Sequence, residues 1–158
     1  FMDDHFTATK RYSDDKILTK TMINNYTKNN LLPPSVKKKY SKEHLLLLIY
    51  IYYYKSILSI GDIQSLLEPL TQRYFHKDGE MNMQSIYEEV FSLEKEQVEK
   101  MKQDVTEKYE TASRIFPEAE AEDQEFLRIF SFICLLSFDV YVKKQVIEKL
   151  IDELPKKS

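Results

Sequence analysis

The titratable side chains that could perform chemistry in this sequence are few and far apart. The three histidines, His5, His44 and His76, are scattered, and none lies in a Cys/His cluster with the spacing of metal ligands. His76, Asp78 and Glu80 form the one suggestive group, but they surround a glycine that predicts a turn, whereas catalysis needs convergent groups in a pocket. We therefore expect no enzymatic activity, no metal site and no cofactor.

The single cysteine, Cys134, cannot form a disulfide within the chain. Its neighbours Phe132, Ile133, Leu135 and Leu136 are apolar, which predicts a core position rather than the accessible, electropositive site of a nucleophile. A lone buried thiol is typical of a reducing compartment, so we expect a cytoplasmic protein.

Glycine is rare, and its scarcity excludes several classes of function. The 158 residues include only two glycines, Gly61 and Gly79, which lie 18 positions apart. Phosphate-binding loops and the dinucleotide fingerprint need two or three glycines within about eight residues, so both nucleotide motifs are excluded. Tight hairpins also rely on glycine, which argues against an all-β architecture.

Basic residues are concentrated in one segment of the chain. Seven lysines and no acidic residue lie between Lys16 and Lys42, although the whole chain carries a net charge of −3. A charge run is usually a solvated helix face, but this one also suits contact with phosphates or with an acidic protein.

The elements that must position these lysines are helices, because apolar residues recur at helical spacing and no segment shows strict two-residue alternation. The longest uncharged apolar stretch, residues 45–54, has ten residues, whereas a membrane helix needs about twenty, so we expect a soluble protein with no membrane partner. The same stretch is apolar on every side, which predicts a surrounded helix. We expect helices at about residues 1–10, 19–29, 41–54, 59–70 and 83–112, and a last helix that follows the break at 117–123 and ends near 154.

The order of motifs between residues 19 and 67 resembles the DNA-binding region of MerR-type regulators. Residues 23–34 read Ile-Asn-Asn-Tyr-Thr-Lys-Asn-Asn-Leu-Leu-Pro-Pro, where the MerR consensus has Leu-Arg-x-Tyr, four residues and then Leu-Leu-Pro-Pro. Residues 38–41 resemble the Arg-x-Tyr-Ser of that family, and residues 58–63 resemble its Ser-Leu-x-x-Ile helix. The whole chain is also similar to a bacterial family, domain of unknown function 1836, whose N-terminal region is described as MerR-like.

The resemblance implies an all-α fold in which a MerR-like helix-turn-helix with a cropped wing precedes two long antiparallel helices. The wing is cropped because only three residues separate Pro34 from Lys38. Two further positions depart from the MerR pattern, since Asn24 replaces a phosphate-contacting arginine and Asn30 replaces a glycine.

In such a fold the helix at about residues 20–29 would read duplex DNA. Its N-terminus offers free N–H groups to a phosphate, and asparagine side chains can pair with the N6 and N7 edge of adenine. Tyr26 occupies the position of the family's tyrosine, and packing beneath the helix explains it equally well. Lysines of the wing would follow the flanking DNA backbone. The candidate DNA-binding residues are Thr19, Lys20, Thr21, Asn24, Asn25, Tyr26, Lys28, Lys37, Lys38 and Lys39.

We expect a DNA-binding region at residues 1–72 and a helical region at 73–158 for dimerisation or effector binding, unless the two form one compact domain. The apolar stripes at 86–112 and 126–138 favour a homodimer, and MerR relatives dimerise through a long helix. In the competing monomer the two helices fold back over residues 45–54. No residue pattern identifies a small-molecule effector. The predicted function is transcriptional regulation through duplex DNA, and the alternative is a module that binds an acidic protein partner.

Overall fold

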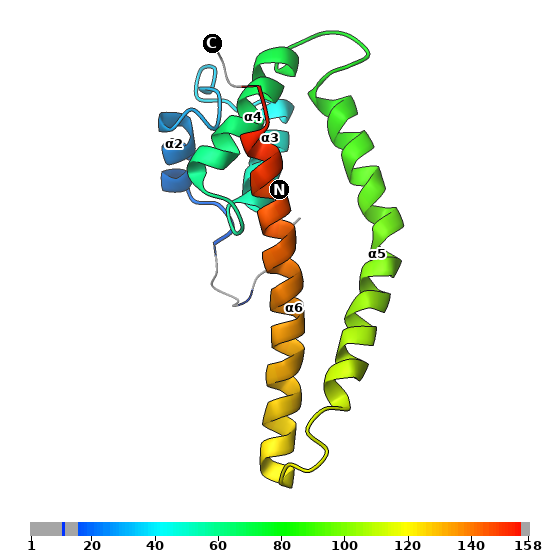
Figure 1. Ribbon diagram of the computed structural model, residues 1–158. Coiled ribbons are helices and arrows are strands. Elements are labelled where there is room, and N and C mark those ends of the chain that lie inside the picture. Colours follow the sequence, from blue (N-terminus) through cyan, green and yellow to red (C-terminus); the bar gives the residue numbers. More distant parts are fainter. Residues whose placement is uncertain (1–10, 12–15, 156–158) are drawn as a thin grey trace. The chain divides into compact units, whose positions relative to one another are not determined.

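The computed structural model describes residue 11 and residues 16–155, so the helix expected at residues 1–10 lies outside the described part. The described residues form five α-helices: α2 (Lys20–Lys28), α3 (Lys42–Tyr54), α4 (Ile60–Tyr74), α5 (Met83–Ser113) and α6 (Ala121–Asp152) (Figure 1). The all-helical prediction is confirmed for this part of the chain. α4 continues four residues beyond its expected end and contains Pro69.

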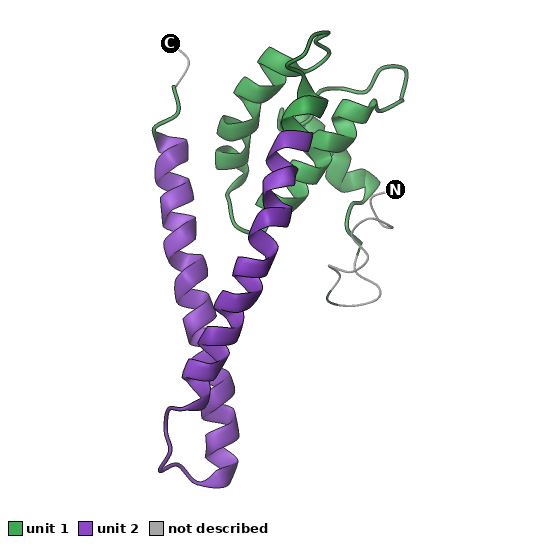
Figure 2. Ribbon diagram, turned by 90° about the vertical axis from the view of Figure 1, so that its right-hand side faces the viewer, with its two compact units in different colours: residues 1–87, 153–158 green, residues 88–152 purple. Residues whose placement is uncertain are grey.

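The chain divides into two compact units, one formed by residues 1–87 with 153–158 and the other by residues 88–152 (Figure 2). This division falls inside α5, whereas the sequence interpretation placed a domain boundary at residue 72. No helix of the described residues combines the length and the hydropathy needed to cross a membrane.

The first unit is built around α3, in which residues 46–51 are buried as the composition predicts, whereas Tyr53 near the end of the same apolar run is 42% exposed. Leu47 and Ile51 have no exposed surface, and α4, which contacts this helix, buries its own Ile63 and Leu67. Aromatic side chains extend the same core, since the Tyr50 ring lies 6.2 Å from that of Tyr54. Tyr50 is 6% exposed, and burial raises its pKa to about 12.

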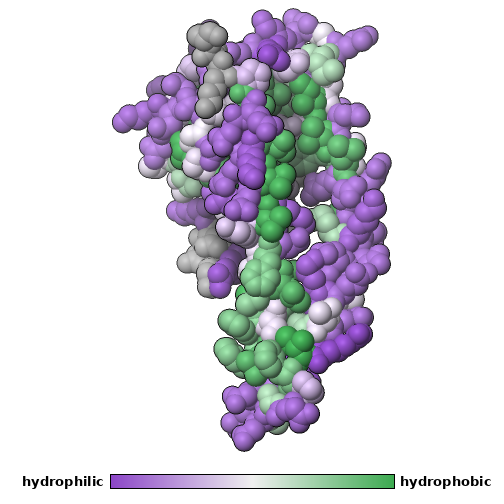
Figure 3. All heavy atoms as spheres, viewed as in Figure 1, coloured by the Kyte–Doolittle hydropathy of each residue, from purple (hydrophilic) through white to green (hydrophobic). Residues whose placement is uncertain are grey.

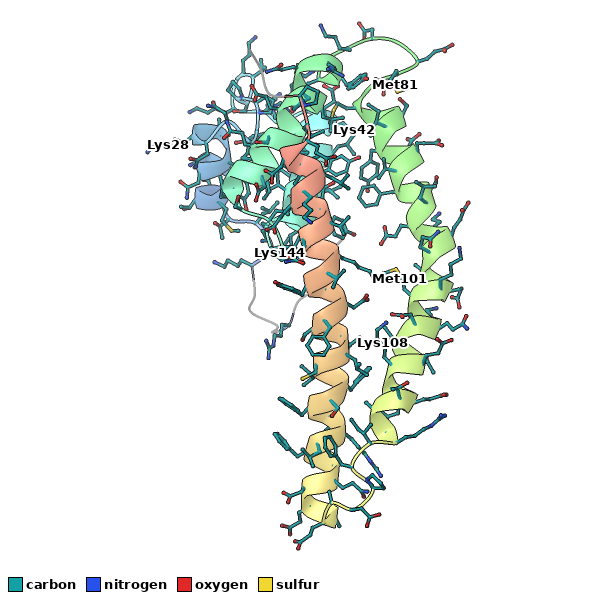
Figure 4. All side chains as sticks on the ribbon, viewed as in Figure 1. Lys28, Lys42, Met81, Met101, Lys108 and Lys144 are labelled. Carbon is teal, nitrogen blue, oxygen red and sulfur yellow. The ribbon has the colours of Figure 1, made fainter. Side chains whose placement is uncertain are left out.

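The second unit is a hairpin in which α5 and α6 run antiparallel and are joined by residues 114–120 (Figures 1 and 2). The Tyr109 and Phe132 rings meet edge to face at 5.5 Å, and Lys108 Nζ, which points from α5 toward α6, lies 3.9 Å from an Asp139 carboxylate oxygen (Figure 4). These contacts align the two helices near the loop.

The expectation that the surroundings of Cys134 form a core is wrong. Ile133 is 54% exposed, and Cys134 and its other neighbours are only half-buried. Within residues 88–152, all of which are described, Ala112 and Ile151 are the two buried apolar residues. Two helices alone enclose little volume, so an apolar stripe on each does not create a core.

Candidate nucleic-acid interface

Capping interactions define both ends of α2. The Thr19 hydroxyl oxygen accepts a hydrogen bond from the Met22 backbone N–H at 3.1 Å, which satisfies one of the unpaired donors of the first turn. At the other end Asn30 adopts the left-handed conformation with φ 56°, and the Leu31 N–H donates to the Tyr26 carbonyl at 2.9 Å. Leu31 is buried, so the exit of the helix is anchored in the core of the first unit.

The outward face of α2 carries polar side chains that have no partner among the described residues. Lys28 projects from α2 away from the rest of the first unit (Figure 4). Residues of this type can bind phosphate oxygens or base edges without first breaking an internal hydrogen bond. The exposed residues of this face are Lys20, Thr21, Asn24, Asn25 and Lys28.

Two of the predicted site residues have structural roles in this arrangement. Thr19 caps α2, as described above, and Tyr26 is 7% exposed and packs on the inner side of the helix. Burial raises the pKa of Tyr26, as desolvation of a phenol does. Of the two interpretations of Tyr26, packing beneath the helix is the one that its burial favours.

The segment expected to form a cropped wing, residues 36–39, makes a two-residue hairpin turn. Val36 and Lys39 form an antiparallel bridge in which each backbone N–H donates to the other residue's carbonyl, at 3.2 and 2.9 Å. The central residues, Lys37 and Lys38, have φ values of 50° and 60°. Such turns favour asparagine and glycine, so two lysines here hold the backbone in a conformation that is costly for their type. All three wing lysines, Lys37, Lys38 and Lys39, are exposed.

A lysine outside the predicted site ties α2 to the core. Lys55 Nζ donates to the Ile17 carbonyl at 3.3 Å and lies 4.8 Å from the centre of the Tyr52 ring. Burial lowers the pKa of the Lys55 ammonium. Ile17 is buried two residues before the cap of α2, so this hydrogen bond fixes the entry to the helix. Ile17 and Lys55 are 38 residues apart in the chain, so sequence spacing alone could not predict this hydrogen bond.

A ring cluster joins the wing to α3 and to the exit of α4. His44 is 1% exposed, and its ring contacts those of Tyr40 and Phe75 at centroid distances of 5.4 and 4.9 Å. Its Nδ1 atom accepts a hydrogen bond from the Ser41 backbone N–H at 3.0 Å, which completes a capping box at the start of α3. In the sequence, a histidine three residues after a possible capping serine was the one feature that could have indicated this capping box.

His76 has a different partner from the one its sequence neighbourhood suggested. Its Nδ1 atom lies 2.6 Å from a Glu43 carboxylate oxygen, and its backbone N–H donates to the same carboxylate at 2.9 and 3.0 Å. Glu43 thus ties the segment after α4 to the start of α3. No group of three His, Cys, Asp or Glu side chains in the described part of the chain is arranged to hold a metal ion.

Comparison with known proteins gives one match. The family model described as Domain of unknown function (DUF1836) matches residues 1–90, which include α2, α3 and α4. No curated protein and no solved structure matches the chain significantly.

Proposed function

Since this chain belongs to the family described as Domain of unknown function (DUF1836), which assigns no activity, we propose from its own residues that the first unit binds duplex DNA as a transcriptional regulator. In this proposal α2 enters the major groove, which has the width of an α-helix. The wing lies beside the groove on the sugar-phosphate backbone, as the MerR resemblance implies.

The observation that carries the proposal is the outward face of α2. Two lysines lie at its ends and two asparagines between them, all exposed and without an internal partner among the described residues. No acidic residue occurs between Lys16 and Lys42 to repel a phosphate. Asn24 and Asn25 can each form a bidentate pair with adenine, while Lys20 and Lys28 reach phosphates.

The wing adds affinity that does not depend on sequence. Three neighbouring lysines on a rigid two-residue turn hold three positive charges close together, and each phosphate that they neutralise releases a counterion. Together with Lys20 and Lys28, they allow five phosphate contacts per copy. The logarithm of the binding constant would then fall with the logarithm of the salt concentration with a slope of about −4 to −5.

The test is a salt titration of the full chain with a fluorescent 30-base-pair duplex, followed by anisotropy. We expect binding at 50 mM salt, a steep loss by 200 mM, and a flatter slope when Lys37, Lys38 and Lys39 are replaced together by alanine. Lys100→Ala is the matched control, because it removes an exposed lysine of α5 and should leave the slope unchanged.

The competing function is a module for an acidic protein partner. Absence of duplex binding in dilute buffer would overturn the DNA proposal and favour that module. Equal binding to an unrelated acidic polymer, with no sequence enriched from a random duplex pool, would contradict base-specific recognition by α2. Enrichment of a defined sequence would support it.

A further inference from the structure

One face of α6 exposes apolar side chains that folded proteins normally bury. Six large hydrophobic residues share this side of the helix, because their spacings of three, four, seven and eight positions each return to nearly the same direction. Figure 3 shows hydrophobic side chains gathered along α6. A continuous face of this kind indicates an interaction site. We call it the α6 face, and it consists of Phe126, Ile129, Phe130, Ile133, Val140 and Tyr141.

A groove on the α6 face has a shape that suits side chains of a second helix. Four residues at positions i, i+3, i+4 and i+7 surround one hole into which a neighbouring helix can insert a side chain. Residues 133–140 therefore surround one hole, and residues 137–144 surround the next, about 6 Å further along the axis. The small Ser137 belongs to both holes and leaves the space open. The groove has a volume of about 410 Å³ and is lined by Ile133, Leu136, Ser137, Val140, Tyr141 and Lys144.

The area of the α6 face suits one docked helix. Its six residues are between 52% and 65% exposed, so at about 200 Å² per residue they leave at most about 700 Å² in water. This area exceeds the largest apolar patch of many monomers, about 300–600 Å². It is smaller than the roughly 1,000 Å² or more that each subunit of an obligate homodimer buries. A helix laid into an apolar groove contacts only a stripe of this kind.

The charge around the α6 face favours a basic partner. Residues 88–152 include 16 acidic and 9 basic residues, a net charge of −7. Lys144, at one end of the groove, lies 3.6 Å from a Glu148 carboxylate oxygen. A second copy would bring the same negative charge, whereas a basic helix would be attracted. Five acidic residues at the other end of the face are exposed and have no ion pair among the described residues: Glu118, Glu120, Glu122, Asp123 and Glu125.

We propose that the α6 face docks an amphipathic, basic α-helix of another protein. Apolar side chains at positions i and i+4 of that helix fill the two holes of the groove, and its Lys or Arg residues lie over residues 118–125. Glu122 lies 15 residues before Ser137, which is about 22 Å along the axis, so the partner helix has at least four turns. An antiparallel partner carries its basic residues at its C-terminal end, where cations are favourable. This inference goes beyond DNA binding and does not depend on it.

The first test uses a synthetic peptide as the probe. A labelled leucine-lysine peptide of about 20 residues, with leucine at helical i, i+3, i+4 and i+7 spacing, is titrated with the full chain and followed by anisotropy. We expect saturable binding in a one-to-one ratio, and binding weaker by about tenfold or more for the same peptide with glutamate in place of lysine. Equal binding of the two peptides would overturn the choice of a basic partner, and binding of neither would overturn the docking site.

Two double variants locate the docking site. Ile133→Gln with Val140→Gln removes apolar side chains from the groove and should weaken peptide binding by about tenfold or more. Val142→Gln with Val146→Gln is the matched control, because both valines are exposed and lie outside the α6 face. Circular dichroism checks that both variants remain helical. Equal effects of the two double variants, or no effect of the first, would contradict the α6 face as the docking site.

The acidic cluster has its own test. Replacing Glu122, Asp123 and Glu125 together by the corresponding amides should weaken binding of the leucine-lysine peptide and flatten its salt dependence. Replacing Glu89, Glu94 and Glu96 by glutamine is the matched control, since it removes the same charge from exposed positions of α5. Equal effects of the two sets would mean attraction by net charge alone and would overturn the role given to residues 118–125.

Sedimentation equilibrium tests whether a second copy covers the α6 face instead. We expect the same mass for the parent chain and for Ile133→Gln with Val140→Gln. A parent mass of twice 18.9 kDa that falls to 18.9 kDa in this variant would overturn the proposal. Peptide binding at α6 without any duplex binding would overturn the proposed DNA function and leave this inference intact.

Discussion

At the residue scale, the wing shows backbone strain next to a proposed ligand. Lys37 and Lys38 both have positive φ, which costs an ordinary L-residue about 1 kcal/mol or more. Glycine at these positions would relieve the strain, so the lysine side chains do not serve stability here. The phosphate binding that we propose for the wing would be a reason for lysine at these positions.

Lys38→Gly should raise the free energy of unfolding by about 1 kcal/mol and flatten the salt slope of duplex binding by about 0.9. Urea unfolding and the salt titration measure the two effects. Lys39→Gly is the matched control, because Lys39 does not have a positive φ, so the same loss of charge should bring no gain in stability. Equal stability changes in both variants would refute the strain argument.

Lysines and asparagines of α2 should differ in how their loss affects recognition. Lys20→Ala or Lys28→Ala should weaken binding to all duplexes alike and flatten the salt slope by about 0.9 per lost contact. Asn24→Ala or Asn25→Ala should instead reduce discrimination at one base pair by roughly 1–3 kcal/mol, with the salt slope unchanged. Competition binding with a panel of duplexes that differ at one base pair measures both the affinity and the discrimination. Alanine variants of the protein that bind as the parent does would exclude α2 as the helix that reads the base sequence.

We expect His44 to make the first unit sensitive to acid. Burial lowers the pKa of His44, opposed by the carbonyl groups of Pro34 and Pro33, and its Nδ1 atom must stay unprotonated to accept the Ser41 N–H. Because the folded chain holds the proton more weakly than the unfolded chain, the stability from neutral His44 is complete above about pH 6.5 and is lost as the pH falls through the folded-state pKa.

His44→Gln should therefore flatten the loss of stability between about pH 7 and 5. A glutamine side chain can still accept the Ser41 N–H at this position of the capping box, but it does not titrate. Urea unfolding at several pH values measures the effect. His76 and Glu43 are present in the parent and in His44→Gln, so their contribution to the pH dependence of stability is common to the two proteins. An unchanged pH profile in His44→Gln would contradict a role for His44.

At the element scale, α4 begins at a capping box formed by Ser59 and Asp62. The Asp62 N–H donates to Ser59 Oγ at 3.1 Å, and the Ser59 N–H donates to Asp62 Oδ2 at 3.2 Å. These bonds satisfy two backbone donors at the helix start, and α4 in turn buries Ile63 and Leu67 against α3.

Ser59→Ala should lower the free energy of unfolding by about 1 kcal/mol, because the Asp62 N–H loses its acceptor. Ser65→Ala is the matched control on the exposed side of the same helix, where alanine should leave stability unchanged or slightly higher. Chemical unfolding of both variants decides the prediction, and an equal effect at the two positions would contradict it.

At the scale of the whole molecule, the two units divide the work that we propose. The first has a buried core and a polar outward helix, whereas the second has long helices and almost no buried apolar residue of its own. A unit that exposes this much apolar surface would gain stability from any partner that covered it.

Local features of the chain were predictable from the sequence alone. The cap at Thr19, the stop at Asn30, the capping box at Ser59 and the burial of residues 46–51 each depend on residues within one or two turns of a helix. Helix periodicity and capping act over this range, so the sequence carries them directly. The outward face of α2 follows from the same periodicity.

Only the tertiary structure decided which partners distant residues have. The hydrogen bond from Lys55 to Ile17 and the pairing of His76 with Glu43 join residues more than 30 positions apart, and no spacing rule predicts them. The surroundings of Cys134 illustrate the same limit, because an apolar sequence is equally typical of a core and of an interface. Whether such residues are buried depends on how many elements surround them, and a hairpin of two helices leaves their outer faces in water.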